Sequence, residues 1–174
     1  EGEPFEVLEA NFSRMQQRKA VVQTKIRNIA TGKIYDMTLQ ASDTFEEAGI
    51  IRKQLMFLYA HRGEYVLTDP ENKKNRFTLR ENTVGENKKW LKPNTEVMAV
   101  FHGDKLLNFT IPIKMDFLVT SAPPGVQGDR SSSGNKSVTL ETGTIIQAPL
   151  FINTGDIIRV NTESGEYTER VKKS

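Results

Sequence analysis

The 174-residue sequence predicts an all-β protein, and three observations indicate this fold class. Short strand-like stretches recur along the whole chain, glycine-containing turns separate them, and only two segments have a helical pattern. The turns are Thr31-Gly32, Arg62-Gly63, His102-Gly103-Asp104, Thr142-Gly143, Thr154-Gly155 and Ser164-Gly165. Each provides the glycine that a tight reversal between strands requires.

The first unit is expected over residues 1–48, with strands at 5–10, 20–29 and 34–39. In the second strand polar and apolar residues alternate, so side chains two positions apart share a face. One face is polar and largely basic, with Gln23, Lys25 and Arg27. The other face, with Val22, Thr24 and Ile26, suits a small core. The acidic sequence Phe45-Glu46-Glu47-Ala48 closes the unit and predicts a short helix over 44–53.

The second unit is expected over residues 49–112, ending at Ile111-Pro112-Ile113, and the third over 113–174. The second has strands at 55–59, 65–68, 76–79, 97–101 and 105–111, with a short helix over 80–91 that contains Gly85 and ends before Pro93. One short helix within a run of five strands is typical of an OB-fold barrel. The third unit has strands at 117–121, 137–141, 145–148, 157–161 and 167–171. Units this small bury only about 60% of their unfolded surface, so we expect them to lean on one another or on a partner.

Two segments of the chain echo each other. LYAHRGEYVLTD around Tyr65 and RVNTESGEYTERV around Tyr167 each contain a strand, a turn ending in Gly-Glu-Tyr, and a second strand. The echo indicates a repeated barrel. The alternative is that Gly-Glu-Tyr is simply a favourable hairpin turn.

Composition excludes several classes of protein. No apolar run approaches the length that spans a bilayer, and the absence of cysteine excludes disulfides, thiolate metal sites and a cysteine nucleophile. His61 and His102 lie beside turn glycines, and no phosphate-binding glycine loop or Gly-x-Ser-x-Gly elbow is present. We therefore expect a protein with no metal, no cofactor and no active site of its own. We expect the protein to be cytoplasmic and monomeric as well, but neither expectation follows from composition.

Basic residues cluster near the N-terminus, although the chain has 24 basic and 22 acidic residues overall. Residues 14–33 hold six basic residues and no acidic one: Arg14, Arg18, Lys19, Lys25, Arg27 and Lys33. The cluster runs from a polar loop into the alternating strand. A charged hairpin arm of this kind favours a polyphosphate partner such as RNA.

The segment from Lys136 to Val171, KSVTLETGTIIQAPLFINTGDIIRVNTESGEYTERV, resembles the C-terminal signature of the bacterial elongation factor P family. Upstream, PFEVLEANF, QTKIRNIATGKI, LYAHRGEY, WLKPNTEV and APPGVQGD follow in the order and spacing of that family, so the resemblance covers essentially the whole chain. It implies an SH3-like N-terminal barrel, about one strand of which would precede Gly2, followed by two OB-fold barrels in an L-shaped arrangement similar in outline to transfer RNA.

The resemblance also implies roles for particular residues. The family's loop usually reads Pro-Gly-Lys-Gly-Gly-Ala, with a lysine at its tip that is often modified; here the tip is Gln16, Gln17, Arg18 and Lys19, and Gln17 stands at the lysine position. We expect an unmodified tip in which Gln17 and Arg18 share the lysine's role at the CCA end of the peptidyl transfer RNA. The expected contacts with the transfer RNA backbone are Arg14, Lys25, Arg27, Tyr167 and Arg170.

Two further sites rest on sequence position. Gly128, Asp129 and Arg130 resemble the start of a Gly-Asp-Thr loop that in the family approaches the exit-site codon. Tyr167 and Arg170 are three residues apart, so a regular strand would place them on opposite faces, and a bulge or a strand end is needed to bring them together.

The remaining aromatic residues are assigned to packing. Trp90 is expected to cap a barrel, and core packing is expected of Phe57, Tyr59, Phe77, Phe101, Phe109, Phe117 and Phe151.

The leading hypothesis is a translation factor that binds the 70S ribosome between the peptidyl and exit sites and relieves stalls at consecutive prolines. One alternative is a general OB-fold protein that binds single-stranded nucleic acid, for which tight and salt-sensitive binding to free oligonucleotides is expected. Another is an enzyme with a split site, which would need a deep pocket with convergent titratable groups.

Overall fold

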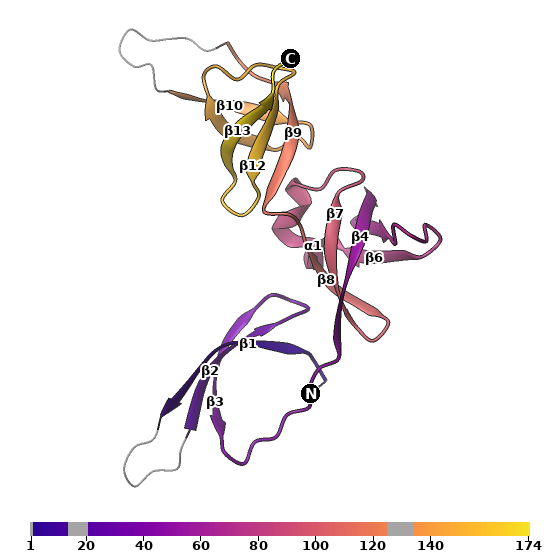
Figure 1. Ribbon diagram of the computed structural model, residues 1–174, viewed down its shortest axis with the longest axis vertical. Coiled ribbons are helices and arrows are strands. Elements are labelled where there is room, and N and C mark those ends of the chain that lie inside the picture. The colour runs from indigo at the N-terminus through magenta and orange to yellow at the C-terminus, as the bar shows by residue number, and fades with distance from the viewer. Residues whose placement is uncertain (1, 14–20, 125–133) are drawn as a thin grey trace.

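The structure is a computed structural model that describes residues 2–13, 21–124 and 134–174. Three antiparallel β-sheets follow one another along the long axis of a bent molecule, with the N-terminal and C-terminal sheets at opposite ends (Figure 1). The predicted all-β fold is confirmed, and each of the thirteen strands in the described ranges overlaps a strand that the sequence predicts. Within the described ranges, no helix has the length and apolar character that crossing a bilayer requires.

The N-terminal sheet has three strands in the order β1 (Phe5–Ser13), β2 (Val21–Asn28) and β3 (Ile34–Gln40). Alternation in β2 acts as predicted, because Thr24 is buried and its hydroxyl donates to the carbonyl of Met37 at 2.8 Å. Gln23 on the other face is exposed. The sheet therefore has one polar face and one apolar face, and β2 is its central strand.

The central barrel is a five-stranded sheet in the order β6-β5-β4-β7-β8. Its elements are β4 (Ile50–His61), β5 (Glu64–Thr68), β6 (Arg76–Arg80), α1 (Glu81–Val84), the 3₁₀ helix Gly85–Lys89, β7 (Glu96–His102) and β8 (Lys105–Thr110). The predicted helix over 80–91 is thus two consecutive short helices. The core consists of Leu55, Phe57, Leu67, Leu79, Val84, Leu91, Val97, Ala99, Phe101 and Phe109.

The C-terminal barrel repeats this strand order, as β11-β10-β9-β12-β13. Its strands are β9 (Lys114–Ser121), β10 (Asn135–Leu140), β11 (Ile145–Pro149), β12 (Ile157–Asn161) and β13 (Glu166–Lys172). Each strand of the central barrel therefore has a counterpart, with β4 matching β9 and β8 matching β13. The two barrels are built on one plan.

Two expectations about the chain are wrong. Residues 44–49 have no helix, and β4 begins at Ile50, which pairs with His102 of β7. The Gly-Glu-Tyr echo does not mark equivalent positions, because one copy turns between β4 and β5 and the other between β12 and β13. These hairpins are the first and the last of their barrels, so Gly-Glu-Tyr is a hairpin turn, and the repeat lies in the strand order instead.

Trp90 joins the two barrels. It follows the 3₁₀ helix of the central barrel, yet its side chain is 2% exposed and belongs to the core of the C-terminal barrel, with its ring 5.7 Å from that of Phe117. The hydroxyl of Thr144 donates to the carbonyl of Lys89 at 2.6 Å beside it. The expectation that Trp90 caps a barrel is confirmed, and the barrel that it caps is the neighbouring one.

Candidate nucleic-acid interface

Several of the predicted site residues lie outside the described residues: Arg14, Gln16, Gln17, Arg18, Lys19, Gly128, Asp129 and Arg130. The strands on either side of the first group are well defined, because β1 and β2 pair in register up to Ser13 and Val21. Residues 14–20 therefore connect the two ends of an antiparallel pair. This is the hairpin position that the sequence predicts for the loop.

Lys25 and Arg27 lie on the polar face of β2, as predicted, but they share it with carboxylates. Lys25 is opposite Glu9 of β1 and Asp36 of β3, and Arg27 is opposite Glu6 of β1. Directly opposed residues of antiparallel strands share a face. Arg27 donates to Glu6 at 2.8 Å, and both side chains are more than two-fifths exposed. Acidic and basic side chains therefore alternate across this face, which the cluster of six basic residues within 14–33 did not indicate.

Tyr167 and Arg170 lie on the same face of β13, through the bulge that the sequence analysis required. Tyr167 pairs with Val160 and Arg170 with Ile158, while the register shifts between these pairs and leaves Thr168 without a partner. Val160 and Ile158 both point into the core. The bulge thus cancels the odd spacing and turns Tyr167 and Arg170 toward the barrel interior and its rim.

Asp156 holds this rim together. Its buried carboxylate accepts hydrogen bonds from the backbone N–H groups of Asn153 and Ser174, both at 2.9 Å, and lies 3.6 Å from the guanidinium of Arg170. Burial alone would raise the pKa of Asp156, but these donors together lower its pKa below the ordinary value. Arg170 also lies over the ring of Phe151, 5.1 Å from its centroid. Arg170 is therefore anchored before any ligand arrives.

Burial likewise raises the pKa of the Tyr167 hydroxyl above its ordinary value, so this group stays a neutral hydrogen-bond donor at physiological pH. The predicted pair on β13 consists of a neutral phenol and a fixed cation. The other predicted pair, on β2, lies at the opposite end of the molecule (Figure 1). The structure thus brings each pair together but does not bring the two pairs to one place.

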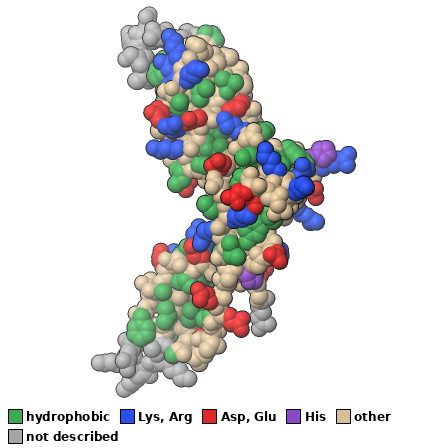
Figure 2. All heavy atoms as spheres, turned by 45° about the vertical axis from the view of Figure 1, so that its right-hand side comes forward, with side chains coloured by type: hydrophobic (Ala, Val, Ile, Leu, Met, Phe, Trp, Pro, Cys, Tyr) green, Lys and Arg blue, Asp and Glu red, His purple; other side chains and the backbone are tan. Residues whose placement is uncertain are grey.

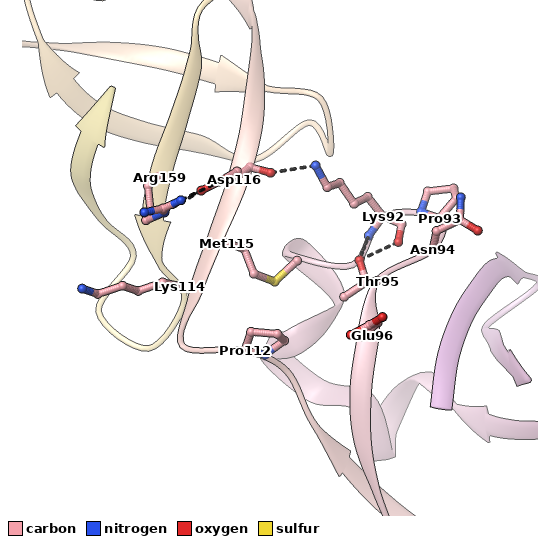
Figure 3. Close-up of a pocket in the computed structure, with 10 residues that line it drawn as sticks. All are labelled: Lys92, Pro93, Asn94, Thr95, Glu96, Pro112, Lys114, Met115, Asp116 and Arg159. Carbon is pink, nitrogen blue, oxygen red and sulfur yellow. Dashed lines mark hydrogen bonds and ion pairs between the residues drawn. The ribbon is translucent and has the colours of Figure 1, made fainter. Parts of the chain in front are cut away.

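A groove of about 430 Å³ lies at the joint between the barrels (Figure 3). Arg159 makes two hydrogen bonds to Asp116 on one wall, at 2.7 and 3.0 Å, and a third to Glu169 at 2.7 Å. The guanidinium of Arg159 lowers the pKa of the Asp116 carboxyl. Lys92 crosses the joint from the central barrel and donates at 2.7 Å to Glu141 and to the carbonyl of Asp116. Lys92 thus ties the two barrels together, while Arg159 joins three strands of the C-terminal barrel, and the groove is lined by cations that already have partners.

Three family models match the chain in succession. The elongation factor P KOW-like domain matches residues 1–45, the elongation factor P OB domain matches 50–109, and the C-terminal domain of elongation factor P matches 115–170. The chain belongs to the elongation factor P family.

Individual relatives are similar in sequence to this elongation factor P family member over almost its full length. Elongation factor P of Desulfatibacillum aliphaticivorans is 38% identical over 173 residues, which are 99% of this chain and 92% of the relative. Elongation factor P of Desulfotalea psychrophila is 35% identical over 173 residues, with the same coverage. That of Rhodococcus erythropolis is 35% identical over 171 residues, 98% of this chain and 91% of the relative. The resemblance inferred from sequence is confirmed, and the chain is a translation elongation factor by family.

Two features of the interface were missed in the sequence analysis. The carboxylates opposite Lys25 and Arg27 become neighbours only through strand pairing, and the sequence gives no register for it. The role of Asp156 could have been suspected from its place beside a turn glycine, where carboxylates accept backbone N–H groups. The ion pair between Asp156 and Arg170 could not have been suspected from sequence, because it depends on the bulge in β13.

Proposed function

We propose that this protein acts in the cytoplasm as a monomer that binds the 70S ribosome between the peptidyl and exit sites and stimulates peptide-bond formation at consecutive prolines. The observation that carries the proposal is the match to elongation factor P domains in order along the whole chain. The elongated, three-part shape supports it, because such a body can reach from one end of a bound transfer RNA to the other (Figure 1).

The proposed mechanism is positional. Proline is a rigid and poor participant in peptide transfer, and a loop that holds the CCA end of the peptidyl transfer RNA reduces the orientational entropy lost on reaching the reactive geometry. The ribosome remains the catalyst. Gln17 and Arg18 are the residues proposed to make this contact, with Gln16 and Lys19 beside them. The β1–β2 pair provides a firm base for the loop, since its register continues to Ser13 and Val21.

Phosphate contacts are proposed to supply affinity without base specificity. Arg14, Lys25 and Arg27 would serve the N-terminal end. The pairing of Arg27 with Glu6 is compatible with this role, because an exposed ion pair contributes little to stability and its cation can exchange a carboxylate for a phosphate at small cost. A polyanion opposite Glu6, Glu9 and Asp36 has to be placed so that it meets the cations and avoids these carboxylates.

At the other end, Tyr167 and Arg170 are proposed to contact the transfer RNA backbone, and Gly128, Asp129 and Arg130 to approach the exit-site codon. The side chain of Arg170 is 31% exposed, which leaves donors free of Asp156 for a phosphate. Since Asp156 and Phe151 already fix this guanidinium, little side-chain entropy remains to be lost on binding. This preorganisation supports the assignment.

A three-proline reporter translated by ribosomes depleted of the factor tests the proposal. The wild-type protein is expected to restore full-length product, and the double variant Gln17→Ala/Arg18→Ala is expected to lose that rescue because the CCA-end contact is gone. Lys33→Ala is the matched control, since it removes a cation of the same basic block at the exposed turn after β2. Full rescue by the double variant would refute the loop assignment.

The same preparation separates the translation factor from a general nucleic-acid binder. A translation factor is expected to co-sediment with 70S ribosomes and to bind free oligonucleotides only weakly. Tight oligonucleotide binding without co-sedimentation, combined with failure of the proline reporter for the wild-type protein, would overturn the proposed function.

A further inference from the structure

The central barrel carries the excess positive charge of the molecule. Residues 49–112 contain 11 lysines and arginines against 7 acidic residues, whereas residues 1–48 contain 6 against 8 and residues 113–174 contain 7 against 7. Basic side chains gather on the central body in the space-filling view (Figure 2). None of the predicted transfer RNA contacts lies in this barrel, so its charge has no partner in the proposed function.

The strand register places part of this charge on one surface. Arg76, Thr78 and Arg80 are alternate residues of β6, all exposed, and they lie opposite Thr68, Val66 and Glu64 of β5. The next strand, β4, continues the rows with Met56, Tyr59 and His61. We call this surface the β4–β6 outer face. The intervening residues Phe57, Leu67 and Leu79 are buried in the core, so most of the face points outward; the exception among its members is Thr68, which is 1% exposed.

Tyr59 reaches this face because of a bulge. The β4–β5 register shifts between Phe57 and Tyr59, so Phe57 points inward and is 3% exposed, while Tyr59, two residues on, points outward and is 46% exposed. The expectation that Tyr59 is a core residue is therefore wrong. An aromatic ring is presented to solvent in the middle of a barrel face, one strand from Val66 and two strands from Thr78.

The cations around Tyr59 are available. Arg76 and Arg80 stand about 13 Å apart along β6, judged from the rise of a β-strand, and Arg62 occupies the β4–β5 turn that borders the face. Among the described residues, none of these three arginines forms an ion pair; the barrel's ion pairs engage Lys53, Lys88, Lys89 and Lys92 instead. Glu64 is the one acidic residue in the three rows that β4, β5 and β6 contribute.

The C-terminal barrel shows that the fold does not impose this chemistry. By the shared strand order, β10 and β11 are the counterparts of β5 and β6. The corresponding outer rows pair Ser137 with Gln147 and Thr139 with Ile145, and they carry no charged residue. The arginines and the exposed tyrosine are thus particular to the central barrel.

We propose that the β4–β6 outer face is a binding surface for single-stranded RNA, with Tyr59 stacking on a base and Arg76, Arg80 and Arg62 contacting phosphates. Strands two and three of an OB barrel, here β5 and β6, are the surface on which this fold presents oligonucleotides. Sequence-tolerant recognition of single strands combines a stacking aromatic side chain with cations along the backbone path, and the face contains both. This surface is an RNA contact additional to those proposed for the loop after β1, for β2, for β13 and for the exit-site codon.

Fluorescence anisotropy with a labelled dodecamer of oligouridine tests the proposal on the full 174-residue chain. Tyr59→Ala is expected to raise the Kd by about tenfold, the usual effect of removing one stacked base, and Tyr59→Phe to leave it within about twofold because the ring remains. Arg76→Gln/Arg80→Gln is expected to raise the Kd and to flatten the slope of log K against log salt by about 1.4, or 0.7 for each phosphate contact.

The matched control is Lys105→Gln/Lys172→Gln, which removes two exposed cations away from the face. Equal weakening by the control and by Arg76→Gln/Arg80→Gln would reduce the effect to net charge and overturn the proposal. A Kd for Tyr59→Ala equal to that of Tyr59→Phe would overturn it as well, as would wild-type binding weaker than about 1 mM. Amide chemical-shift changes confined to β4, β5 and β6 on titration with the RNA would support it.

This assay contains no ribosome, so its result is independent of the proline reporter. If the wild-type protein fails the reporter but binds oligouridine through Tyr59 and Arg76, the RNA face stands and the proposed function is refuted. If the wild-type protein passes the reporter and Tyr59→Ala binds oligouridine as tightly as wild type, the proposed function stands and the RNA face is refuted.

Discussion

Replacing Trp90 with alanine is expected to destabilise the C-terminal barrel and to spare the central barrel that supplies the residue. Trp90 is 2% exposed, and almost all of its roughly 250 Å² is removed from water against the C-terminal core. At about 25 cal/mol per Å² the burial term is at most about 6 kcal/mol, and measured truncations of buried tryptophans cost about 3–5 kcal/mol. We expect a loss in this measured range.

Native-state hydrogen exchange distinguishes the two barrels in one experiment, because slowly exchanging amides report the unfolding free energy of the unit that contains them. In Trp90→Ala, protected amides of β9 and β12 are expected to exchange about a hundredfold faster or more, since 1.4 kcal/mol corresponds to a factor of ten. Amides of β4 and β5 are expected to change little.

Val84→Ala is the reciprocal control. Val84 lies in the same helical segment but packs in the central core, so its truncation, costing about 2 kcal/mol, is expected to accelerate exchange in β4 and β5 instead. Equal acceleration of both barrels by Trp90→Ala, or acceleration limited to β4 and β5, would refute the assignment of Trp90 to the neighbouring core.

Two further predictions concern the C-terminal barrel and its joint. Asp156→Asn is expected to lower the free energy of unfolding by about 1–3 kcal/mol at pH 7. Folding lowers the pKa of Asp156, so its carboxylate stabilises the protein above the ordinary pKa, and this stabilisation is lost as pH falls through the folded pKa. The difference in Tm between wild type and variant should therefore shrink below about pH 4, and a constant difference down to pH 2 would contradict the argument. Thr144→Val removes the donor to the carbonyl of Lys89 and should cost about 1 kcal/mol, seen as a lower urea midpoint at unchanged m-value. Thr142→Val should cost less, because it keeps that bond and removes only the longer one, at 3.2 Å, from the Thr142 hydroxyl to the Thr144 hydroxyl.

The positions of the strands could be predicted from sequence, because alternation and turn glycines are local signals. The helix expected over 44–53 could not be corrected locally, since Phe45-Glu46-Glu47-Ala48 has helical composition. The segment lies between two separate sheets, and Ile50 is drawn into β4 by its pairing with β7. Tertiary pairing overrides propensity at that point.

Bulges set the limit of prediction for the candidate sites. Alternation assigned Tyr59 to the same face as Phe57, and one extra residue in β4 reversed this assignment. The same device in β13 placed Tyr167 and Arg170 together, and it was anticipated only because the family resemblance required both residues at one surface. A bulge leaves no consistent mark in the sequence, yet it changes which side chains reach solvent.

The placement of Trp90 has a consequence for how the chain is made. Synthesis runs from the N-terminus, so the central barrel can be complete at Thr110 before any strand of its neighbour has emerged. Until β9 to β13 have been added, the indole has no core to enter and stays open to water or to chaperones. The nascent chain thus passes through a stage in which an apolar side chain is exposed, until its own last 60 or so residues fold and bury it.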